Sequence, residues 1–462
     1  MSWGDDGNIL AGSPAGLMRI PASGGVGQEV ERGAEPQIFP QVLPGARAVL
    51  FNTVGHNNVL DNVDIEVLEF KTGKKKTLLH GGYFPRYLPA SGETGYLVYV
   101  HEGTLFGVGF SAKDLEVHGT PVPLLDDVAA SSSLDRYGGG QFAFSETGTF
   151  VYLAGRIHDE AYPILVMDAA GRIAPLLAQT GAYGNPRFSP DGKQFAYTAP
   201  GSKGIEVWAH NLEHNTSTQL TFTGPGSHEL AWSPDSIHLA FGDGAALWWI
   251  LADGSGAAQE LLSESGRPFS FSPDGRLVYS GNAGGAIPDI RTLLLDLSDP
   301  EHPRPGKVEM VLSDPHVVNV DPAFSPDGKF LAYVSSEMGG EEVFVRSFPG
   351  PGGKWKVSAE GGKFPAWSGT THELLFLGSS DRVMVADYNI QGDSFGAGKP
   401  RVWSPTQIRG TSVSRNFDLA PDGKRLAFFP RPVEEQQSKG PLHVTFLLNF
   451  FDELRRRVPS EK

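Results

Sequence analysis

Two carboxylates stand at equivalent positions of a recurrent motif. Glu229 lies three residues before Trp232, and Asp321 lies three residues before Phe324; in both places Ser-Pro-Asp follows the aromatic residue. Glycoside hydrolysis requires two carboxyl groups that flank a bond, one as acid and the other as base or nucleophile. His228 directly precedes Glu229 and is a candidate to assist a proton transfer. These three residues form one catalytic hypothesis.

The same alignment places amides, aromatic rings and further charges in the other copies of the motif. Three residues before the aromatic position stand Phe39, Phe84, Gln141, Asn185, Phe364 and Asn416. One residue before it stand Arg86, Arg187 and Asp418. Amides bind hydroxyl groups and aromatic rings pack on sugar faces, so this set predicts a site for a small polar ligand such as a carbohydrate. The alternative is that these side chains join adjacent repeats through hydrogen bonds to the backbone.

The aligning motif recurs along the whole chain. Nine intervals separate Asp6 from Asp422, so ten units follow one another about 46 residues apart. In the best copies, Pro fixes φ and Gly accepts a positive φ at the turn Ser-Pro-Asp-Gly, so the aspartate is expected to be a turn residue. Strands such as 330–333 and 342–346 follow the turn. Four short strands per unit are typical of a β-propeller blade, so we expect an all-β propeller fold.

Ten units exceed the blades of one ordinary ring, which has about four to eight. One interpretation keeps residues 1–448 as a single region of propeller repeats. The alternative divides the chain near Gly181, into four units over 1–181 and a six-bladed propeller over 182–448. In both interpretations residues 449–462 form a C-terminal helix and tail.

The C-terminal segment departs from the strand pattern. The apolar run 442–449 predicts a buried strand of the final blade. The helix that follows carries acidic residues in its first turn and arginines in its last, as the helix dipole favours. Its apolar stripe consists of Phe450, Phe451, Leu454 and Val458. We expect this helix to dock on the propeller as a clasp and not to bind a membrane.

Composition excludes several classes of protein. The formal net charge is −15, which argues against a nucleic-acid partner, and the chain has no cysteine for disulfides or thiolate metal sites. The thirteen histidines occur singly, and the acidic group Asp61, Asp64 and Glu66 is interpreted as a solvated face, so no metal or cofactor is predicted. No run approaches the ~20 apolar residues of a membrane helix. The N-terminal residues have neither a basic region nor an apolar core, so we expect no export signal in this chain.

Three stretches, together with the Ser-Pro-Asp-Gly units, resemble a known group. They are 16–25, 342–350 with 354–358, and 448–454. They are similar to the TolB-like (WD40-like) propeller repeats that follow the kinase domain of acidobacterial-type bacterial Ser/Thr protein kinases. The resemblance implies a propeller that binds or senses a ligand outside the cytoplasm. The kinase motifs themselves are absent, so no kinase activity is expected.

Two functions follow from these observations. The first is a sensor or scaffold propeller that binds a small polar ligand, a peptide or a protein at the mouth of its central channel. The alternative is a hydrolase, most plausibly a glycoside hydrolase, that uses the pair Glu229 and Asp321 at the same mouth.

Overall fold

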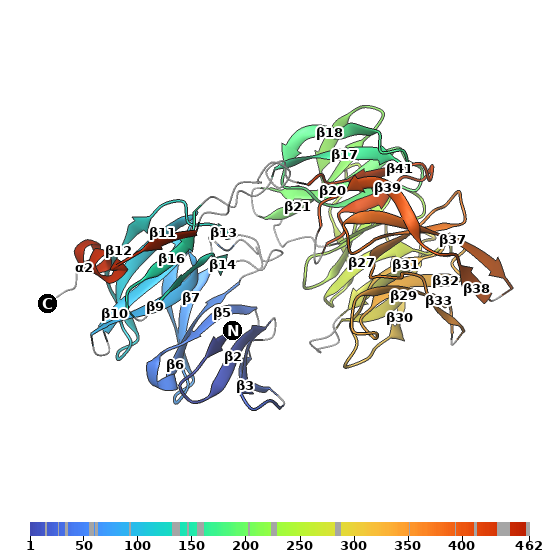
Figure 1. The fold of residues 1–462 in the computed structure, drawn as a ribbon. Helices are drawn as coiled ribbons and strands as arrows, with labels where there is room; N and C mark the ends of the chain where they lie inside the picture. The colour runs from blue at the N-terminus through green and yellow to red at the C-terminus, as the bar shows by residue number, and fades with distance from the viewer. Residues whose placement is uncertain are drawn as a thin grey trace. The chain divides into compact units, whose positions relative to one another are not determined.

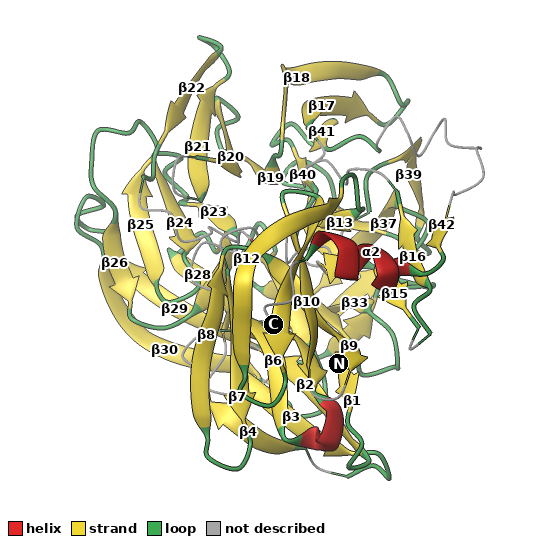
Figure 2. Cartoon of the chain, turned by 90° about the vertical axis from the view of Figure 1, so that its left-hand side faces the viewer, coloured by secondary structure: helices red, strands yellow, loops and turns green. Residues whose placement is uncertain are grey.

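The structure is a computed structural model that is about 60% strand, arranged in antiparallel sheets, and 3% helix (Figures 1 and 2). It describes residues 1–13, 16–25, 27–32, 36–54, 60, 63–91, 94–131, 139–145, 147–154, 161–201, 204–222, 229–281, 288–350, 352–392, 394–410, 414–431 and 444–458. The chain divides into two compact units. Unit 1 contains Met1–Asp159 and Lys439–Lys462, and unit 2 contains Glu160–Ser438. The predicted all-β propeller class with a short C-terminal helix is confirmed.

Unit 1 contains three four-stranded sheets, one three-stranded sheet and a two-stranded ribbon in its described part. The first sheet is β1 (Ser2–Trp3), β2 (Asn8–Ser13), β3 (Gly16–Pro21) and β4 (Gln28–Arg32). The second is β5 (Gln37–Val42), β6 (Ala48–Thr53), β7 (Asp64–Glu69) and β8 (Lys74–His80), with the 3-10 turn η1 (Pro44–Ala46). The third is β9 (Tyr83–Ser91), β10 (Thr94–His101), β11 (Thr104–Ser111) and β12 (Glu116–Leu125). The ribbon is β13 (Ala130–Ser131) and β14 (Gly139–Gly140), and the fourth sheet is β15 (Phe142–Phe144), β16 (Phe150–Leu153) and β42 (Val444–Leu447), followed by α2 (Phe450–Arg457).

The described part of unit 2 contains six sheets. The strands of the first are β19 (Gly184–Phe188), β20 (Gln194–Pro200), β21 (Ile205–Asn211) and β22 (Thr216–Gln219), and of the second β23 (Leu230–Trp232), β24 (His238–Gly242), β25 (Leu247–Leu251) and β26 (Gln259–Leu262). The third has β27 (Gly266–Phe271), β28 (Arg276–Gly281), β29 (Asp289–Asp296) and β30 (Arg304–Leu312), and the fourth β31 (Asn319–Phe324), β32 (Phe330–Ser335), β33 (Glu342–Ser347) and β34 (Lys354–Lys356). The fifth has β35 (Lys363–Trp367), β36 (Glu373–Leu377), β37 (Arg382–Gln391), β38 (Ser394–Ala397) and β39 (Arg401–Gln407). The sixth combines β17 (Tyr162–Asp168) and β18 (Ile173–Gly181) with β40 (Phe417–Leu419) and β41 (Arg425–Phe428).

In most sheets a copy of the repeated turn joins the first strand to the second, as between β19 and β20. At residues 189–194, the Ser189 hydroxyl donates to Asp191 Oδ1 at 2.6 Å and accepts from the Gln194 amide at 2.9 Å. Gly192 adopts φ +70°, which a residue with a Cβ rarely adopts. Burial raises the pKa of Asp191, but the hydrogen bonds from Ser189 and the Lys193 amide outweigh it and leave that pKa lowered. The aspartate of the repeat is therefore a turn residue, as the sequence predicts.

The sixth sheet closes unit 2 into a ring. Its outer strands β18 and β17 come from the beginning of the unit, and its inner strands β41 and β40 come from the end. β17 and β41 pair antiparallel from Leu165–Phe428 to Asp168–Arg425. Because one sheet is built from both ends of the segment, the ends of unit 2 are held together by backbone hydrogen bonds.

Unit 2 is an insertion within the last sheet of unit 1. β16 ends at Leu153, the chain then forms all of unit 2, and β42 returns to pair with β16 from Phe150–Leu447 to Leu153–Val444. The prediction that 442–449 forms a buried strand of the final blade is therefore wrong. β42 belongs to unit 1, and its side chains Val444 and Phe446 are 47% and 65% exposed.

Helix α2 docks on unit 1, as the sequence predicts. Phe450, Leu454 and Val458 are buried in the core beside β9 and β10, and the Phe450 ring stacks on Phe150 with centroids 4.4 Å apart. The Phe450 amide donates to the Gly148 carbonyl at 2.8 Å. Figure 2 shows α2 beside β12, β15 and β16. The helix is therefore part of the hydrophobic core that lies beside β9, β10 and β16 of unit 1.

Removal of residues 450–462 should destabilise unit 1 by about 2–5 kcal/mol, comparable to the loss of one or two buried large side chains. The measurement is thermal unfolding of the truncated chain against the full chain. The variant Arg455→Ala, which changes an exposed residue of the same helix, is the control and should unfold like the full chain. Equal melting temperatures for the truncated and full chains would contradict docking of the helix.

Candidate functional site

The first strand of most sheets contains a bulge at the aligned position. The register shifts between Gly184 and Arg187 in β19, and between Val320 and Ala323 in β31. Within these bulges Asn185 and Asp321 adopt φ of 51° and 54°. Asn and Asp are the non-glycine residues that most readily adopt this conformation. Backbone geometry therefore accounts for part of the amide and carboxylate pattern that the sequence analysis assigned to ligand binding.

The predicted binding residues fall into two sets. Unit 1 contains Phe39, Phe84, Arg86 and Gln141, and unit 2 contains Asn185, Arg187, Glu229, Asp321, Phe364, Asn416 and Asp418. His228 lies outside the described residues. The two sets belong to different units, so each is considered by itself.

A buried ion pair joins the first two sheets of unit 2. Arg187 Nη2 lies 2.9 Å from Glu229 Oε2, and the side chains are 6% and 2% exposed. Arg187 also donates through Nε to the Leu230 carbonyl at 3.0 Å. A buried charge without such partners would carry a desolvation cost of several kcal/mol. The two side chains therefore fix each other and the contact between their sheets.

Arg415 is a central residue that the sequence analysis missed. It is 5% exposed, its amide donates to Glu229 Oε1 at 3.4 Å, and its Nη2 donates to the Pro365 carbonyl at 2.8 Å. Burial lowers the pKa of Arg415 to about 10, and the positive charge of Arg187 acts in the same direction. The alignment of the repeats did not compare the position that Arg415 occupies. The signal for Arg415 in the sequence is that it directly precedes Asn416, which stands at an aligned position.

Asp418 links the last sheet of unit 2 to the first. Its Oδ2 accepts from the Phe188 amide at 2.8 Å, and its Oδ1 lies 3.7 Å from Arg415 Nη1. In the equivalent position Ser270 accepts from the Phe324 amide at 2.9 Å. These contacts are of the kind that the alternative interpretation expects, in which the polar residue before the aromatic joins adjacent blades. Asn416 is fully buried and donates to the Arg409 carbonyl.

Asp321 differs from the other carboxylates because no arginine forms an ion pair with it among the described residues. Burial raises the pKa of Asp321 to about 7, and the negative charge of Glu229 acts in the same direction. Arg415, the Phe364 amide and Arg267 oppose this shift. Burial also raises the pKa of Glu229 against the opposing charges of Arg187 and Arg415. The charge of Glu229 therefore influences the ionisation of Asp321.

Arg267 is an exposed residue whose charge acts on this buried group. It is exposed at the beginning of β27, yet its charge lowers the pKa of both Glu229 and Asp321. β27 begins at the side of unit 2 that carries the connections between successive sheets, which we call the mouth side. Arg267 was not among the predicted residues, because Pro268 occupies the aligned position in its repeat.

In unit 1 the predicted residues form an aromatic cluster. Phe39 contacts Phe84 edge to face with centroids 5.3 Å apart, and Phe84 contacts Phe142 at 5.3 Å. The Arg86 guanidinium lies 3.7 Å from the centre of the Phe84 ring and donates to the Phe39 carbonyl at 3.1 Å. Burial lowers the pKa of Arg86 to about 10. Gln141 is exposed. The contacts of Phe39, Phe84 and Arg86 hold adjacent sheets together.

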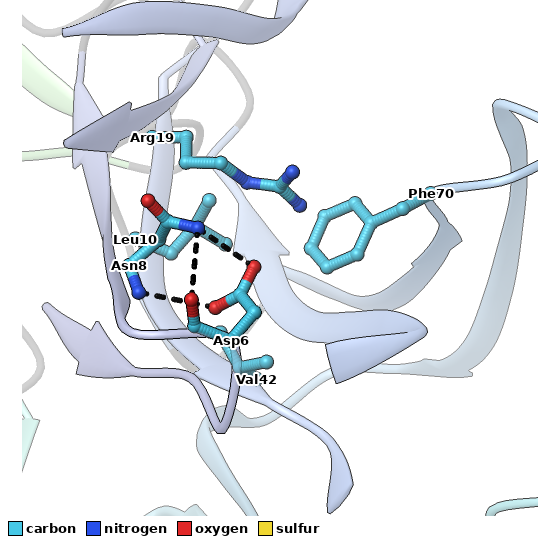
Figure 3. Close-up of a pocket in the computed structure, with 6 residues that line it drawn as sticks. All are labelled: Asp6, Asn8, Leu10, Arg19, Val42 and Phe70. Atoms are coloured by element: carbon cyan, nitrogen blue, oxygen red, sulfur yellow. Dashed lines mark hydrogen bonds between the residues drawn. The ribbon is translucent and has the colours of Figure 1, made fainter. Parts of the chain in front are cut away.

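A small surface pocket lies at the first repeated turn of unit 1 (Figure 3). Asn8 Nδ2 donates to Asp6 Oδ2 at 2.9 Å, and the Arg19 guanidinium lies 4.5 Å from the centre of the Phe70 ring. Its polar groups are thus engaged with one another, as in the turns of the other repeats. The acidic group of the sequence analysis lies elsewhere in unit 1. Asp64 Oδ1 lies 2.9 Å from His80 Nδ1, and Glu66 Oε2 lies 3.5 Å from Lys75 Nζ. Asp61 lies outside the described residues.

Neither a metal cluster nor a membrane-spanning helix is found in the described part of the chain. No group of three His, Asp or Glu side chains there has a geometry that would hold a metal ion. No helix there is long and apolar enough to cross a membrane.

No protein-family model and no curated protein matches the chain. The solved structures similar to it include TolB-like β-propellers. One is a protein provisionally assigned as TolB from Agrobacterium tumefaciens, 19% identical, covering 59% of this chain and 99% of that chain with a TM-score of 0.46. TolB from Acinetobacter baumannii is 13% identical and covers 75% of this chain and 79% of that chain with a TM-score of 0.39. A gluconolactonase from Xanthomonas campestris is 14% identical and covers 61% and 90%, with a TM-score of 0.38.

The raised pKa of Asp321 predicts a pH-dependent effect of Asp321→Asn. The folded pKa of about 7 exceeds the unfolded value of about 3.9, so the folded protein holds an extra proton between these limits. The free energy of unfolding of the natural chain should therefore fall as pH rises through this window. Asn also tolerates the φ of 54°. The variant should gain about 1–3 kcal/mol over the natural chain at pH 8, and the gain should vanish near pH 4.

Urea unfolding of both proteins between pH 4 and pH 8 measures this difference. The exposed Asp314→Asn is the control and should show no such trend. A stability gain that does not change with pH, or a loss at pH 8, would contradict the assignment.

Proposed function

We propose that the chain is a non-catalytic binding propeller and that unit 2 receives a peptide or a segment of a partner protein on its mouth side. The observation that carries the proposal is the exposure of large apolar side chains there. Phe222 and Met338 are 60% and 63% exposed, and Val318 is 36% exposed, all on connections that lie on this side. A surface that gathers exposed apolar side chains into a patch is typical of sites that bind proteins.

Large apolar side chains are also exposed on the opposite side of unit 2, where Ile237 is 52% and Ile173 is 49% exposed. Arg267 adds an exposed charge to the mouth side, so a partner with both apolar groups and a carboxylate would find complementary contacts.

The buried centre supports a scaffold more than an enzyme. One oxygen of Glu229 pairs with Arg187 and the other accepts from the Arg415 amide. A general acid or base has to reach its substrate within hydrogen-bond distance, and these contacts occupy the oxygens that it would use. Glu229 is 1% exposed and Asp321 is 7% exposed. The structural similarity to a gluconolactonase, at a TM-score of 0.38, does not count as evidence for catalysis in this chain.

The hydrolase remains the second candidate, because one observation favours it. A carboxyl group with a pKa of about 7, Asp321, lies near enough to Glu229 for its charge to act on that pKa, and such a pair suits the division of roles between an acid and a base. Under this proposal Asp321 donates the proton, Glu229 acts as the ionised partner, and a carbohydrate reaches them from the mouth side. His228 stays a candidate for assisting the transfer.

Selection of a phage-displayed random peptide library on the immobilised full chain tests the binding proposal. Enriched peptides should bind with dissociation constants that rise at least tenfold in Met338→Ser and in Arg267→Ala, measured by fluorescence polarisation. Met310→Ser is the matched control, because Met310 is 52% exposed on the outer strand β30, and it should bind like the natural chain. Absence of enrichment, or equal loss in the control, would contradict the proposal.

A panel of chromogenic glycosides and esters separates the two candidates. The scaffold proposal expects no turnover above that of a heat-denatured sample. Turnover that disappears in both Asp321→Asn and Glu229→Gln would establish the hydrolase and overturn the scaffold.

A further inference from the structure

Unit 1 forms an open arc of four sheets and not a closed ring. β2 packs on β5, β6 packs on β9, and Phe84 of β9 contacts Phe142 of β15, so the sheets follow one another in order. No comparable packing joins the fourth sheet to the first within the described part of the unit. Unit 2 closes its ring through a sheet built from both of its ends, and unit 1 has no equivalent sheet among its described strands. Each end of the arc therefore presents the face of a sheet.

The free face of the first sheet is apolar. Leu10 and Leu17 point to the other face, where they pack on Val49 and Phe51 of the second sheet. Trp3 pairs with Ile9, and Ile9 pairs with Ile20, so these side chains share the opposite face. Trp3 is 67% exposed. This face, the leading flank, consists of Trp3, Ile9, Ala11, Met18 and Ile20.

The free face of the fourth sheet is apolar as well. Phe150 points inward to the core that contains α2. Val151 pairs with Phe446 and Leu153 pairs with Val444, so these four share the face directed away from that core. This face, the trailing flank, consists of Ala143, Val151, Leu153, Val444 and Phe446. Both flanks are mainly apolar among the described residues, and Glu29 of the edge strand β4, which pairs with Met18, adds a charge at the border of the leading flank.

The flanks continue an interface that the unit already uses. Between its first and second sheets, Leu and Val side chains of one sheet face pack on Val and Phe side chains of the next. The leading and trailing flanks are mainly apolar like the two faces of that contact. The trailing flank corresponds to the face that packs on the next sheet, and the leading flank to the face that receives it. Sheet faces of this type are stable when another sheet covers them.

We propose that the leading flank of one chain packs on the trailing flank of a second copy, and that two copies thereby close unit 1 into one ring of eight blades. A two-fold axis generates both contacts at once, since each copy offers one leading and one trailing flank. Four sheets from each copy make eight, which lies within the range of about four to eight blades that single rings adopt. The two contacts close, so the assembly stops at a dimer and does not extend into a fibre.

Sedimentation equilibrium of the full chain tests this dimer. The expected mass is twice 49.6 kDa. Phe446→Asp and Trp3→Asp each place a charge in a flank and should raise the dissociation constant of the dimer at least tenfold. Ile237→Asp is the matched control, because Ile237 is 52% exposed in unit 2 and Phe446 is 65% exposed, and it should leave the dimer intact. Circular dichroism of each variant shows that the sheets remain folded.

Two results would overturn the proposal. A monomeric natural chain at 100 times the concentration used for the variants would mean that the flanks close on each other or are covered by another protein. A dimer that persists in both flank variants, or that is lost in the control, would place the contact elsewhere. Both results are independent of peptide binding by unit 2, so failure here leaves the proposed function unaffected.

Discussion

The pairing of β17 with β41 is the interaction on which unit 2 depends. Four residue pairs, from Leu165–Phe428 to Asp168–Arg425, join segments more than 250 residues apart in sequence. Without this ladder the sixth sheet would be divided into two strand pairs, and neither two-stranded piece would be stable in water. The pairing also brings Asp418 to the Phe188 amide and Arg415 to Glu229. Ring closure and the buried charges of the centre are therefore parts of one arrangement.

The centre of unit 2 holds charges in a place where most proteins hold apolar side chains. Arg187, Glu229, Arg415 and Asp418 satisfy one another and the backbone of neighbouring sheets. Replacing one member would leave its partner buried and unpaired, which costs more than the pair contributes. Such a network fixes how the first, second, fifth and sixth sheets meet, because these contacts satisfy its members only in one arrangement. Asp321 lies at its margin, with fewer partners and a raised pKa.

The sequence predicts the local architecture well, because short motifs determine where the turns lie. The repeated turn places Gly192 and Asp191 where the backbone requires them, and in most sheets a copy lies between the first and second strands. Helix α2 and its buried stripe were also predicted, since helical spacing identifies the buried face.

The long-range arrangement could not be predicted in the same way. No local signal states that β42 pairs with β16 or that β41 pairs with β17, because both pairings depend on contacts hundreds of residues apart. The alignment of repeats found Glu229 and Asp321, and in the structure the charge of Glu229 raises the pKa of Asp321. The alignment missed Arg415 and Arg267. The alignment also combined Phe39 and Phe84 of unit 1 with residues of unit 2, because an aligned position in a repeat does not show to which unit that repeat belongs.

Hydrogen exchange of the full chain tests the closure of unit 2 most directly. If β17 and β41 complete the ring, the amides of residues 165–168 and 425–428 should exchange as slowly as those of β20 and β21 within one continuous sheet. They should also become exposed in the same cooperative step. Exchange of β17 and β41 that is much faster than exchange of β20 and β21 would show that the ends of the segment separate on their own, and it would contradict the account.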